Sequence, residues 1–265
     1  MTPQQIGEAA IFLAQARLSG PPTPSLPDNL TAPGTIAEGY AVQSALHAVL
    51  ESAGFGPRVG HKIGCTTPVM QAYLGIDHPC AGEVFETTVF DRAVELPLSR
   101  YQRVGVECEI AARLGRDLPV RSGGHSRESV SEAVDSLMAG IELVDDRYAD
   151  YSALPPPVLV ADDFFNAGVV LGTAVPDWRS LDLSAIEGVM TVDGTEVGRG
   201  FGADILGHPL AALAWLADHR AALGMPLRAG EFVMLGSVVK TVWIEAPAKV
   251  GIRFAGLGEA SVTFV

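Results

Sequence analysis

The chain has 265 residues, of which 48% are hydrophobic and 18% charged, so it can bury a sizeable core as one large domain or two small ones. Its net charge of −13, with no cluster of Lys or Arg to neutralise phosphates, excludes nucleic acid and anionic membrane surfaces as expected partners.

Three features of the sequence indicate the cellular compartment: the apolar runs, the N-terminus and the cysteines. No apolar run approaches the roughly 18 residues of a membrane span. Residues 1–5 lack the basic and apolar regions of a signal peptide. The cysteines, Cys65, Cys80 and Cys108, are odd in number and without metal-site spacing, as expected in a reducing compartment. We therefore expect a cytoplasmic protein with no membrane partner.

The N-terminal part of the chain is helical in pattern. Apolar residues recur at helical spacing over residues 2–19. Residues 20–33 contain five prolines and predict a loop or extended connector. Thr35 is placed to cap a second helix that runs to about Ala53.

After Gly54 the pattern changes to short β-prone segments broken by Gly and Pro. These segments are residues 59–64, 83–91, 104–114, 158–161, 166–173, 188–198, 231–236, 241–245 and 249–264. Helical patterns interrupt them at residues 127–139 and 209–223. We predict an α+β fold with a helical N-terminal section, residues 1–56, and a β-rich body, residues 57–265. The alternating strands and helices of a doubly wound sheet do not occur.

Two glutamates stand two residues apart in one β-prone segment. Side chains at i and i+2 of a strand share a face, so Glu107 and Glu109 should project together, opposite Val106, Cys108 and Ile110. Two like charges on an apolar element require a compensating cation or proton. A divalent ion held by oxygen ligands is one interpretation. The other is a half-exposed strand whose polar face carries two glutamates.

A third acid, Glu142, lies in an apolar segment where an unpaired charge is costly. With Glu107 and Glu109 it would complete a three-carboxylate site with open positions, which is typical of Mg²⁺. The neighbouring pair Asp145-Asp146 is interpreted as a solvated turn or as a partner of Arg147.

One lysine and one turn are candidates for contact with an anion. Lys62, flanked by Ile63 and Gly64, could neutralise an anionic substrate or transfer a proton; the alternative is an exposed lysine. The pair Gly236-Ser237 could offer backbone N–H groups and a hydroxyl to a carboxylate, or form an ordinary turn. The sequence contains no zinc-type histidine pair, no Gly-x-Ser-x-Gly and no Gly-x-Gly-x-x-Gly motif.

Several motifs in order resemble those of the 2-hydroxypenta-2,4-dienoate (2-oxopent-4-enoate) hydratases and vinylogous 4-oxalocrotonate decarboxylases, members of the fumarylacetoacetase superfamily in bacterial meta-cleavage pathways. The motifs are Ala37-Glu-Gly-Tyr-Ala-Val-Gln, Gly60-His-Lys-Ile-Gly-Cys-Thr, Val106-Glu-Cys-Glu-Ile-Ala, Gly140-Ile-Glu-Leu-Val, Ala161-Asp-Asp, Gly207-His-Pro-Leu-Ala-Ala-Leu-Ala-Trp-Leu, Leu235-Gly-Ser and Gly256-Leu-Gly. The resemblance implies a fumarylacetoacetase-type mixed β-roll.

The resemblance also implies roles for particular residues. It assigns Mg²⁺ or Mn²⁺ to Glu107, Glu109 and Glu142, and it places Lys62 in the active site. With it we predict catalytic roles for Lys62, Asp162 and Cys80. We also predict that a small anionic substrate is contacted by Gly64, Cys65, Ser237 and Phe164. It further implies a homo-oligomer, with a paralogous decarboxylase or a downstream aldolase as a partner.

Two segments depart from the family pattern. Many of these hydratases carry Asp-aromatic-Gly where this chain has Cys80 and Ala81, so a carboxylate associated with proton transfer is absent. The segment Asp162-Asp-Phe-Phe-Asn replaces Asp-Asn and small residues, and its two phenylalanines would reline a pocket. Both changes bear on the choice of substrate.

The expected activity is metal-dependent addition of water to a 2-hydroxy-2,4-dienoate, giving a 4-hydroxy-2-oxo acid in aromatic meta-cleavage catabolism. The alternative is decarboxylation of the 4-oxalocrotonate type. Two further readings rank lower. Acylpyruvate C–C hydrolysis needs a His–Glu pair on an N-terminal lid helix, where the chain offers only His47. A non-catalytic partner subunit is disfavoured by the intact carboxylates and Lys62.

Overall fold

The computed structural model describes residues 1–19, 26–27 and 29–265, so part of the proline-rich connector predicted at 20–33 lies outside the described residues. Two helices, α1 (Pro3–Ser19) and α2 (Ile36–Leu50), form the N-terminal section, and a π-helical turn, Glu51–Phe55, follows. Thr35 caps α2 by accepting a hydrogen bond from the backbone N–H of Glu38. Both predicted helices are confirmed.

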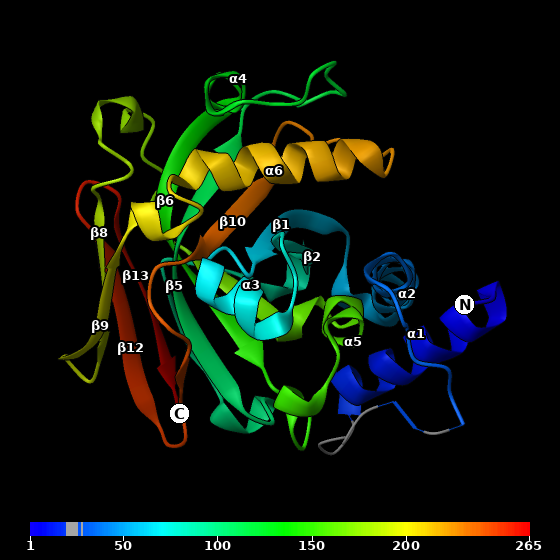
Figure 1. Cartoon of the computed structure of the whole chain (residues 1–265). Coiled ribbons are helices and arrows are strands. Elements are labelled where there is room, and N and C mark those ends of the chain that lie inside the picture. The colour runs from blue at the N-terminus through cyan, green and yellow to red at the C-terminus, as the bar shows by residue number, and fades with distance from the viewer. Residues whose placement is uncertain (20–25, 28) are drawn as a thin grey trace.

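Among the described residues, eight strands form the larger sheet, in the order β2-β1-β10-β5-β6-β7-β3 with β11 paired to β5 (Figure 1). Their bounds are β1 (Arg58–Gly64), β2 (Cys80–Phe85), β3 (Val89–Asp91), β5 (Val104–Leu114), β6 (Val134–Asp145), β7 (Asn166–Leu171), β10 (Phe232–Ser237) and β11 (Val242–Trp243). The β1–β10 and β3–β7 pairs are parallel and the others antiparallel, so the sheet is mixed.

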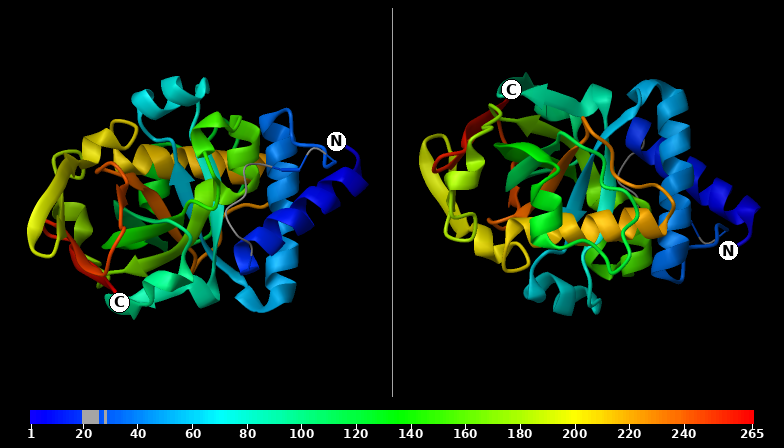
Figure 2. Two further views of the ribbon diagram at one scale, coloured as in Figure 1. Left: turned by 90° about the horizontal axis from the view of Figure 1, so that it is seen from below. Right: turned by 90° about the horizontal axis from the view of Figure 1, so that it is seen from above.

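A second sheet of five strands has the order β4-β13-β12-β8-β9 within the described chain. Its strands are β4 (Ala93–Leu96), β8 (Glu187–Val192), β9 (Thr195–Phe201), β12 (Ala248–Phe254) and β13 (Gly258–Phe264). Figure 2 shows this sheet at one end of the molecule and α1 and α2 at the other. The predicted α+β class is confirmed, whereas the division at residue 56 stays a prediction.

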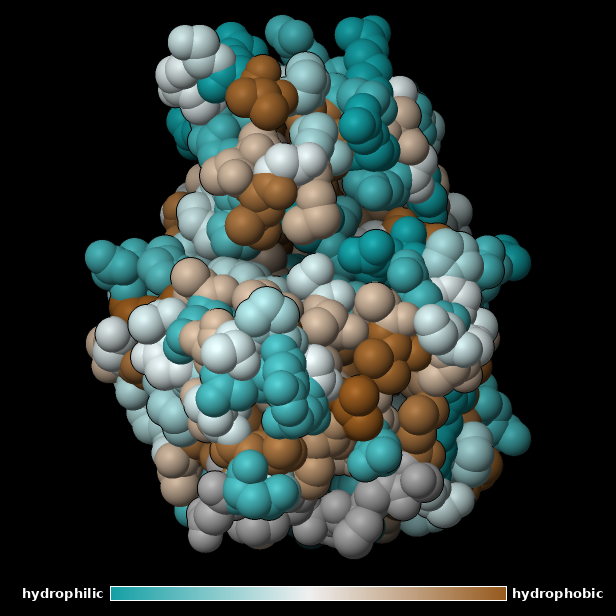
Figure 3. Space-filling view, turned by 90° about the vertical axis from the view of Figure 1, so that its right-hand side faces the viewer, coloured by the Kyte–Doolittle hydropathy of each residue, from teal (hydrophilic) through white to brown (hydrophobic). Residues whose placement is uncertain are grey.

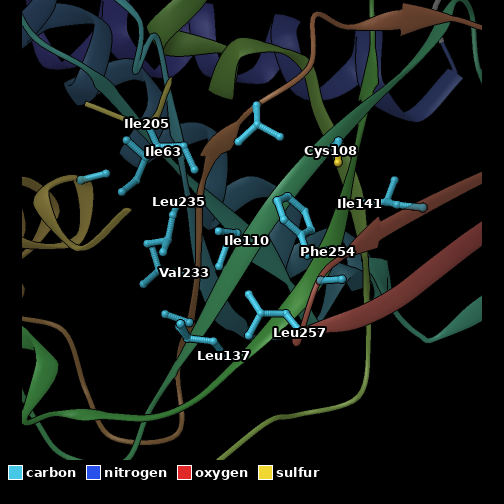
Figure 4. Close-up of a cluster of buried hydrophobic side chains, with 14 of the residues drawn as sticks. Ile63, Cys108, Ile110, Leu137, Ile141, Ile205, Val233, Leu235, Phe254 and Leu257 are labelled. Carbon is cyan, nitrogen blue, oxygen red and sulfur yellow. The ribbon is translucent and has the colours of Figure 1, made fainter. Parts of the chain in front are cut away.

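The main apolar core lies between the two sheets and under α6 (Pro209–Ala222), the helix predicted at 209–223. Figure 4 shows Cys108 and Ile110 of β5 within this core, beside Phe254 of β12. A second apolar cluster joins α1 and α2 to Phe85 of β2, which attaches the helical section to the edge of the larger sheet. Gly39 of α2 lets the helix approach α5 (Pro156–Ala161), since a Cβ there would lie 2.5 Å from the carbonyl oxygen of Pro157.

Two predicted elements are wrong. The helix predicted at 127–139 is only α4 (Arg127–Ser131), and β6 begins at Val134. Almost every residue of β6 is buried, so the strand lacks the alternation that separates a strand from a buried helix. The strand predicted at 158–161 is helix α5 (Pro156–Ala161), which begins with two prolines, as first helical turns tolerate.

The remaining helix, α3 (Pro68–Leu74), follows β1 and is capped by Thr67. No helix in the described part of the chain is long and apolar enough to cross a membrane. On the face that carries α1 and α2, polar and apolar side chains are interspersed (Figure 3).

Candidate active site

Three carboxylates, one partly buried and two fully buried, converge on the polar face of the two longest strands. Glu107 and Glu109 share one face of β5, as predicted, and Glu107 is the direct antiparallel partner of Glu142 on β6. One ligand atom from each of the three lies within 4.8 Å of the others. Glu109 and Glu142 are each 1% exposed, which rules out the half-exposed polar strand that the sequence left open.

Each carboxylate is held by a neighbour that leaves oxygen atoms for a cation. Glu107 accepts a hydrogen bond from the Thr241 hydroxyl. Glu109 accepts one from the backbone N–H of Gly236 (2.9 Å), and Glu142 accepts one from the side-chain amide of Asn166 (2.9 Å). The second oxygen of Glu142 is buried and has no hydrogen-bond partner among the described residues. A buried oxygen in that state is suited to a metal ion.

The contact from Gly236 depends on local backbone geometry. The pairing of β10 with β5 shifts between Met234 and Ser237, which frees the Gly236 N–H from the ladder. Gly236 has φ 121°, and a Cβ there would lie 2.5 Å from the Thr66 hydroxyl oxygen, so only glycine fits.

Lys62 is buried in the same site. Its side chain is 4% exposed and its Nζ lies 3.2 Å from Glu142, so the alternative of an exposed lysine is wrong. Lys62 belongs to β1, which β10 and β5 separate from β6 in the sheet order, so the contact is made across the sheet face. A Cβ on Gly64 would lie 3.6 Å from the Lys62 amine, which places Gly64 at the same site.

The electrostatics favour a divalent cation at this position. Burial raises the pKa of Glu107 to about 7, with the nearby Glu142 adding to the effect. Burial, Glu142 and Glu107 together raise the pKa of Glu109 well above its usual value. Burial opposes the charge of Lys62, but the three carboxylates outweigh it and raise the pKa of the amine. When all three carboxylates are ionised, the one lysine leaves two negative charges uncompensated, and a divalent ion can supply the matching positive charge.

Phe164 forms one wall beside Lys62. The Lys62 Nζ lies 5.7 Å from the centre of the Phe164 ring, within the range of a cation–π contact. Phe164 is the middle of three consecutive residues in the left-handed region, with φ of 52°, 47° and 68° at Asp163, Phe164 and Phe165. Such a run is unusual for non-glycine residues and needs support from its surroundings.

That support comes from the N-terminal helices. Asp163 is fully buried, and its carboxylate lies 2.8 Å from Nε2 of His47 on α2 and 3.0 Å from Nη2 of Arg17 on α1. His47 Nδ1 lies 3.1 Å from Glu83 of β2. Burial raises the pKa of Asp163, but His47 and Arg17 outweigh it, so the pKa is lowered and the carboxylate is ionised.

Asp162, a predicted catalytic residue, lies in this ion network instead of among the three carboxylates. Its carboxylate lies 2.8 Å from Arg17 Nε and 2.9 Å from Arg147 Nη2. The solvated turn considered for Asp145-Asp146 is wrong because both are buried. Asp145 accepts backbone hydrogen bonds at the start of β5 and lies 3.9 Å from Arg147, the partner that the sequence analysis named.

Cys80 and Cys65 lie at the end of the site formed by β1 and β2. Cys80 is the direct ladder partner of Gly64 and is 1% exposed. Cys65 is partly buried and directly follows Gly64 in the chain. The hydroxyl of Ser237 bonds to the backbone, accepting from the N–H of Cys108 (3.0 Å) and donating to the carbonyl of Val239 (2.6 Å).

Sequence reasoning missed several residues that shape the site. Asn166 and Thr241 orient two of the carboxylates. Asn166 ends the segment Asp162-Asp-Phe-Phe-Asn but was given no role there, and Thr241 belongs to none of the motifs. Asp163 and His47 were visible in the sequence, but their pairing joins residues 116 positions apart. The signal that could have found it is a lone histidine on an otherwise apolar helix, which needs a buried partner.

Comparison with known proteins agrees with this arrangement. Residues 85–265 match the family model described as fumarylacetoacetate (FAA) hydrolase C-terminal. This chain belongs to that family. A 2-keto-4-pentenoate hydratase of Paraburkholderia xenovorans (strain LB400) is 37% identical over 266 residues, which cover 100% of this chain and 96% of the relative. A 2-hydroxyhexa-2,4-dienoate hydratase of Comamonas testosteroni is 32% identical over 259 residues, covering 95% and 93%.

A solved family member has nearly the same fold. It is the 4-oxalocrotonate decarboxylase from Pseudomonas putida G7, complexed with magnesium and adipate. The TM-score is 0.91 at 26% identity, over 100% of this chain and 99% of the decarboxylase. The family resemblance and the fumarylacetoacetase-type fold inferred from the sequence are thus confirmed.

Proposed function

We propose that this protein adds water to a 2-hydroxy-2,4-dienoate, through its 2-oxo-4-enoate form, to give a 4-hydroxy-2-oxo acid in the breakdown of aromatic compounds. The full-length similarity to a 2-keto-4-pentenoate hydratase is the observation that carries this proposal. The buried carboxylates and Lys62 supply the chemistry that such a reaction needs.

We further propose that Glu107, Glu109 and Glu142 hold Mg²⁺ or Mn²⁺. Three carboxylates, an unpartnered buried oxygen and two uncompensated charges fit a hard divalent ion. Bound there, such an ion supplies Lewis-acid stabilisation of negative charge that develops on a substrate oxygen.

The side chains of the protein have separate tasks in this proposal. The Lys62 ammonium balances the substrate carboxylate and is positioned to pass a proton to the far end of the dienol. Phe164 packs against Lys62 and keeps water from its charge, which strengthens its interaction with an anion. Gly64 presents no side chain to the amine, where a Cβ would lie 3.6 Å from the Lys62 Nζ.

The alternative activity is decarboxylation of a 4-oxalocrotonate-like acid. It is favoured by the overall similarity to a 4-oxalocrotonate decarboxylase and by the missing acid at position 80. Hydrolysis of a C–C bond has less support. Both ring nitrogens of His47 face carboxylates, and its pKa is raised to about 9, so the ring is protonated at neutral pH and is not a base for water.

The deciding experiment compares turnover of 2-hydroxypenta-2,4-dienoate with turnover of 4-oxalocrotonate, with and without Mg²⁺ or Mn²⁺. We expect metal-dependent hydration of the dienoate as the faster reaction. Faster carbon dioxide release from 4-oxalocrotonate would assign the alternative activity. No turnover of either substrate with metal present would refute both.

The metal site is tested separately with Glu109→Gln, which removes charge but little volume. We expect calorimetry to show metal binding weakened by more than about 100-fold, the upper range for groups that only support a ligand. Glu95→Gln on the exposed edge of β4 is the matched control and should bind as the unmodified chain does. Unchanged affinity in Glu109→Gln would remove this residue from the site. The cytoplasmic location, the homo-oligomer and the complex with a decarboxylase or aldolase stay predictions.

A further inference from the structure

Two of the three cysteines meet beside Lys62. Gly64, the last residue of β1, is the direct partner of Cys80, the first residue of β2. Cys65 follows Gly64 and ends the strand with a left-handed backbone, φ 58°. Directly paired residues of antiparallel strands have Cα atoms about 4.5 to 5.5 Å apart. Cys65 is therefore only one residue away from the residue that lies directly opposite Cys80. The two thiols are close enough to influence each other's ionisation.

The two thiols have different surroundings. Cys65 is partly accessible, whereas Cys80 is 1% exposed. The neighbouring Cys80 thiol and the positive charge of Lys62 outweigh burial and lower the pKa of Cys65. The neighbouring Cys65 thiol and burial raise the pKa of Cys80. A partly accessible thiol of lowered pKa next to a buried second thiol is the pattern of a reactive cysteine with its resolving partner.

We propose that Cys65 and Cys80 form an oxidation site that takes hydrogen peroxide and closes a reversible disulfide at the edge of the active site. The Cys65 thiolate attacks one peroxide oxygen, the O–O bond breaks, and the departing hydroxide takes up a proton to leave as water. The sulfenic acid on Cys65 is then attacked by the Cys80 sulfur, the S–O bond breaks, and a second water leaves. Two thiols lose two electrons, and one peroxide becomes two waters.

The place of the two cysteines in the chain suits this closure. A disulfide needs Cα atoms about 4.4 to 6.8 Å apart, and Cys65 directly follows Gly64, the ladder partner of Cys80. The third cysteine, Cys108, cannot take part, because it is fully buried in the core on the face of β5 opposite Glu107 and Glu109 (Figure 4).

The disulfide would change the surroundings of Lys62. A Cβ at Gly64 would lie 3.6 Å from the Lys62 amine and 4.0 Å from the Cys80 carbonyl oxygen, so the linked sulfurs would stand at the approach to that amine. We expect turnover to fall at least about tenfold, since small misplacements of reacting groups have effects of this size. This consequence rests on the proposed function, whereas the formation of the bond does not.

Mass spectrometry tests the bond directly on the full chain. Cleavage after Lys62 and Arg92 gives one peptide, residues 63–92, that contains both cysteines, and residues 104–113 carry Cys108. After treatment with hydrogen peroxide and alkylation in denaturant, we expect peptide 63–92 to be unalkylated and lighter by two hydrogen atoms. Dithiothreitol should restore two alkylated thiols. Peptide 104–113 should stay alkylated throughout.

Cysteine variants and the other possible oxidation products test whether the bond joins Cys65 and Cys80. Cys65→Ser and Cys80→Ser should each abolish the loss of two hydrogens, whereas Cys108→Ser should keep it. The proposal is overturned if peptide 63–92 keeps both thiols, gains oxygen atoms only, or becomes linked to a second chain. Turnover of the oxidised protein is compared with turnover of the same protein before oxidation. Equal turnover would refute the expected loss of activity on disulfide formation. Absence of turnover in the reduced protein would refute the proposed function and leave the mass result intact.

Discussion

His47 should make the stability of the fold depend on pH. Its side chain is buried between Glu83 and Asp163, with nitrogen–oxygen distances of 3.1 Å and 2.8 Å. Burial opposes the charged ring, but the two carboxylates outweigh it and raise the pKa from 6.5 to about 9. The charged groups around this cluster come from α1, β1 and α6, and they are Arg17, Arg58 and Arg220.

The size and sign of the effect follow from this shift. The folded pKa is the higher one, so the stabilisation is complete below pH 6.5 and is lost as the pH rises through about 9. A pKa raised from 6.5 to about 9, at roughly 1.4 kcal/mol per pKa unit, corresponds to about 3.5 kcal/mol. Asp163 and Glu83 have lowered pKa values and stay ionised between pH 6.5 and about 9, so they do not contribute to the change of stability with pH there.

The assay is urea unfolding of the metal-free chain between pH 6 and pH 10, in unmodified form and as His47→Gln. The stability difference between the two should shrink by about 3 kcal/mol over this range. His47→Gln also removes the packing of the ring against Phe85, but this loss does not depend on pH and does not change how the stability difference varies with pH. His219→Gln is the matched control, because burial lowers the pKa of His219 to about 4 and the ring stays neutral. If the free energies of unfolding of the unmodified chain and His47→Gln change in parallel with pH, His47 does not carry the assigned positive charge.

Two further substitutions test the candidate site. Lys62→Met should lower kcat/KM by about 10²- to 10⁴-fold, the usual range for a positioned acid–base group. It should also tighten Mg²⁺ binding, because a cation 3.2 Å from Glu142 is removed; unchanged kcat/KM and metal affinity would contradict its role. Cys80→Asp should lower turnover of the bulkier members of a dienoate and dicarboxylate panel, because it puts a larger, charged side chain at a position that is 1% exposed and paired with Gly64. An unaltered profile would place position 80 outside the active site.

The parts of the site that could be predicted from sequence depend on local geometry. The two-residue period of a strand was enough to place Glu107 and Glu109 on one face. Glu142 was marked by its apolar neighbours, although its own strand was missed. A strand buried on both faces carries no period, so the sequence favoured a helix across the first half of β6.

The contacts that could not be predicted depend on the order of strands in the sheet. Lys62 reaches Glu142 across two intervening strands, and no sequence spacing encodes that order. Asp162 was predicted to be catalytic from its motif, yet the motif cannot show that Arg17 and Arg147 surround it. Pairings of this kind become visible only when distant elements are brought together.

The N-terminal helices have a further role besides covering the edge of the sheet. Three consecutive non-glycine residues in the left-handed region cost on the order of 1 to 3 kcal/mol each. Arg17 and His47 fix the first of them, Asp163, through buried ion pairs, and the second, Phe164, then lies against Lys62. Removing the charge of His47 therefore weakens the contact that holds this segment in place. The orientation of the Lys62 amine, and with it substrate binding, should consequently respond to a substitution on a helix that contributes no residue to the carboxylate cluster.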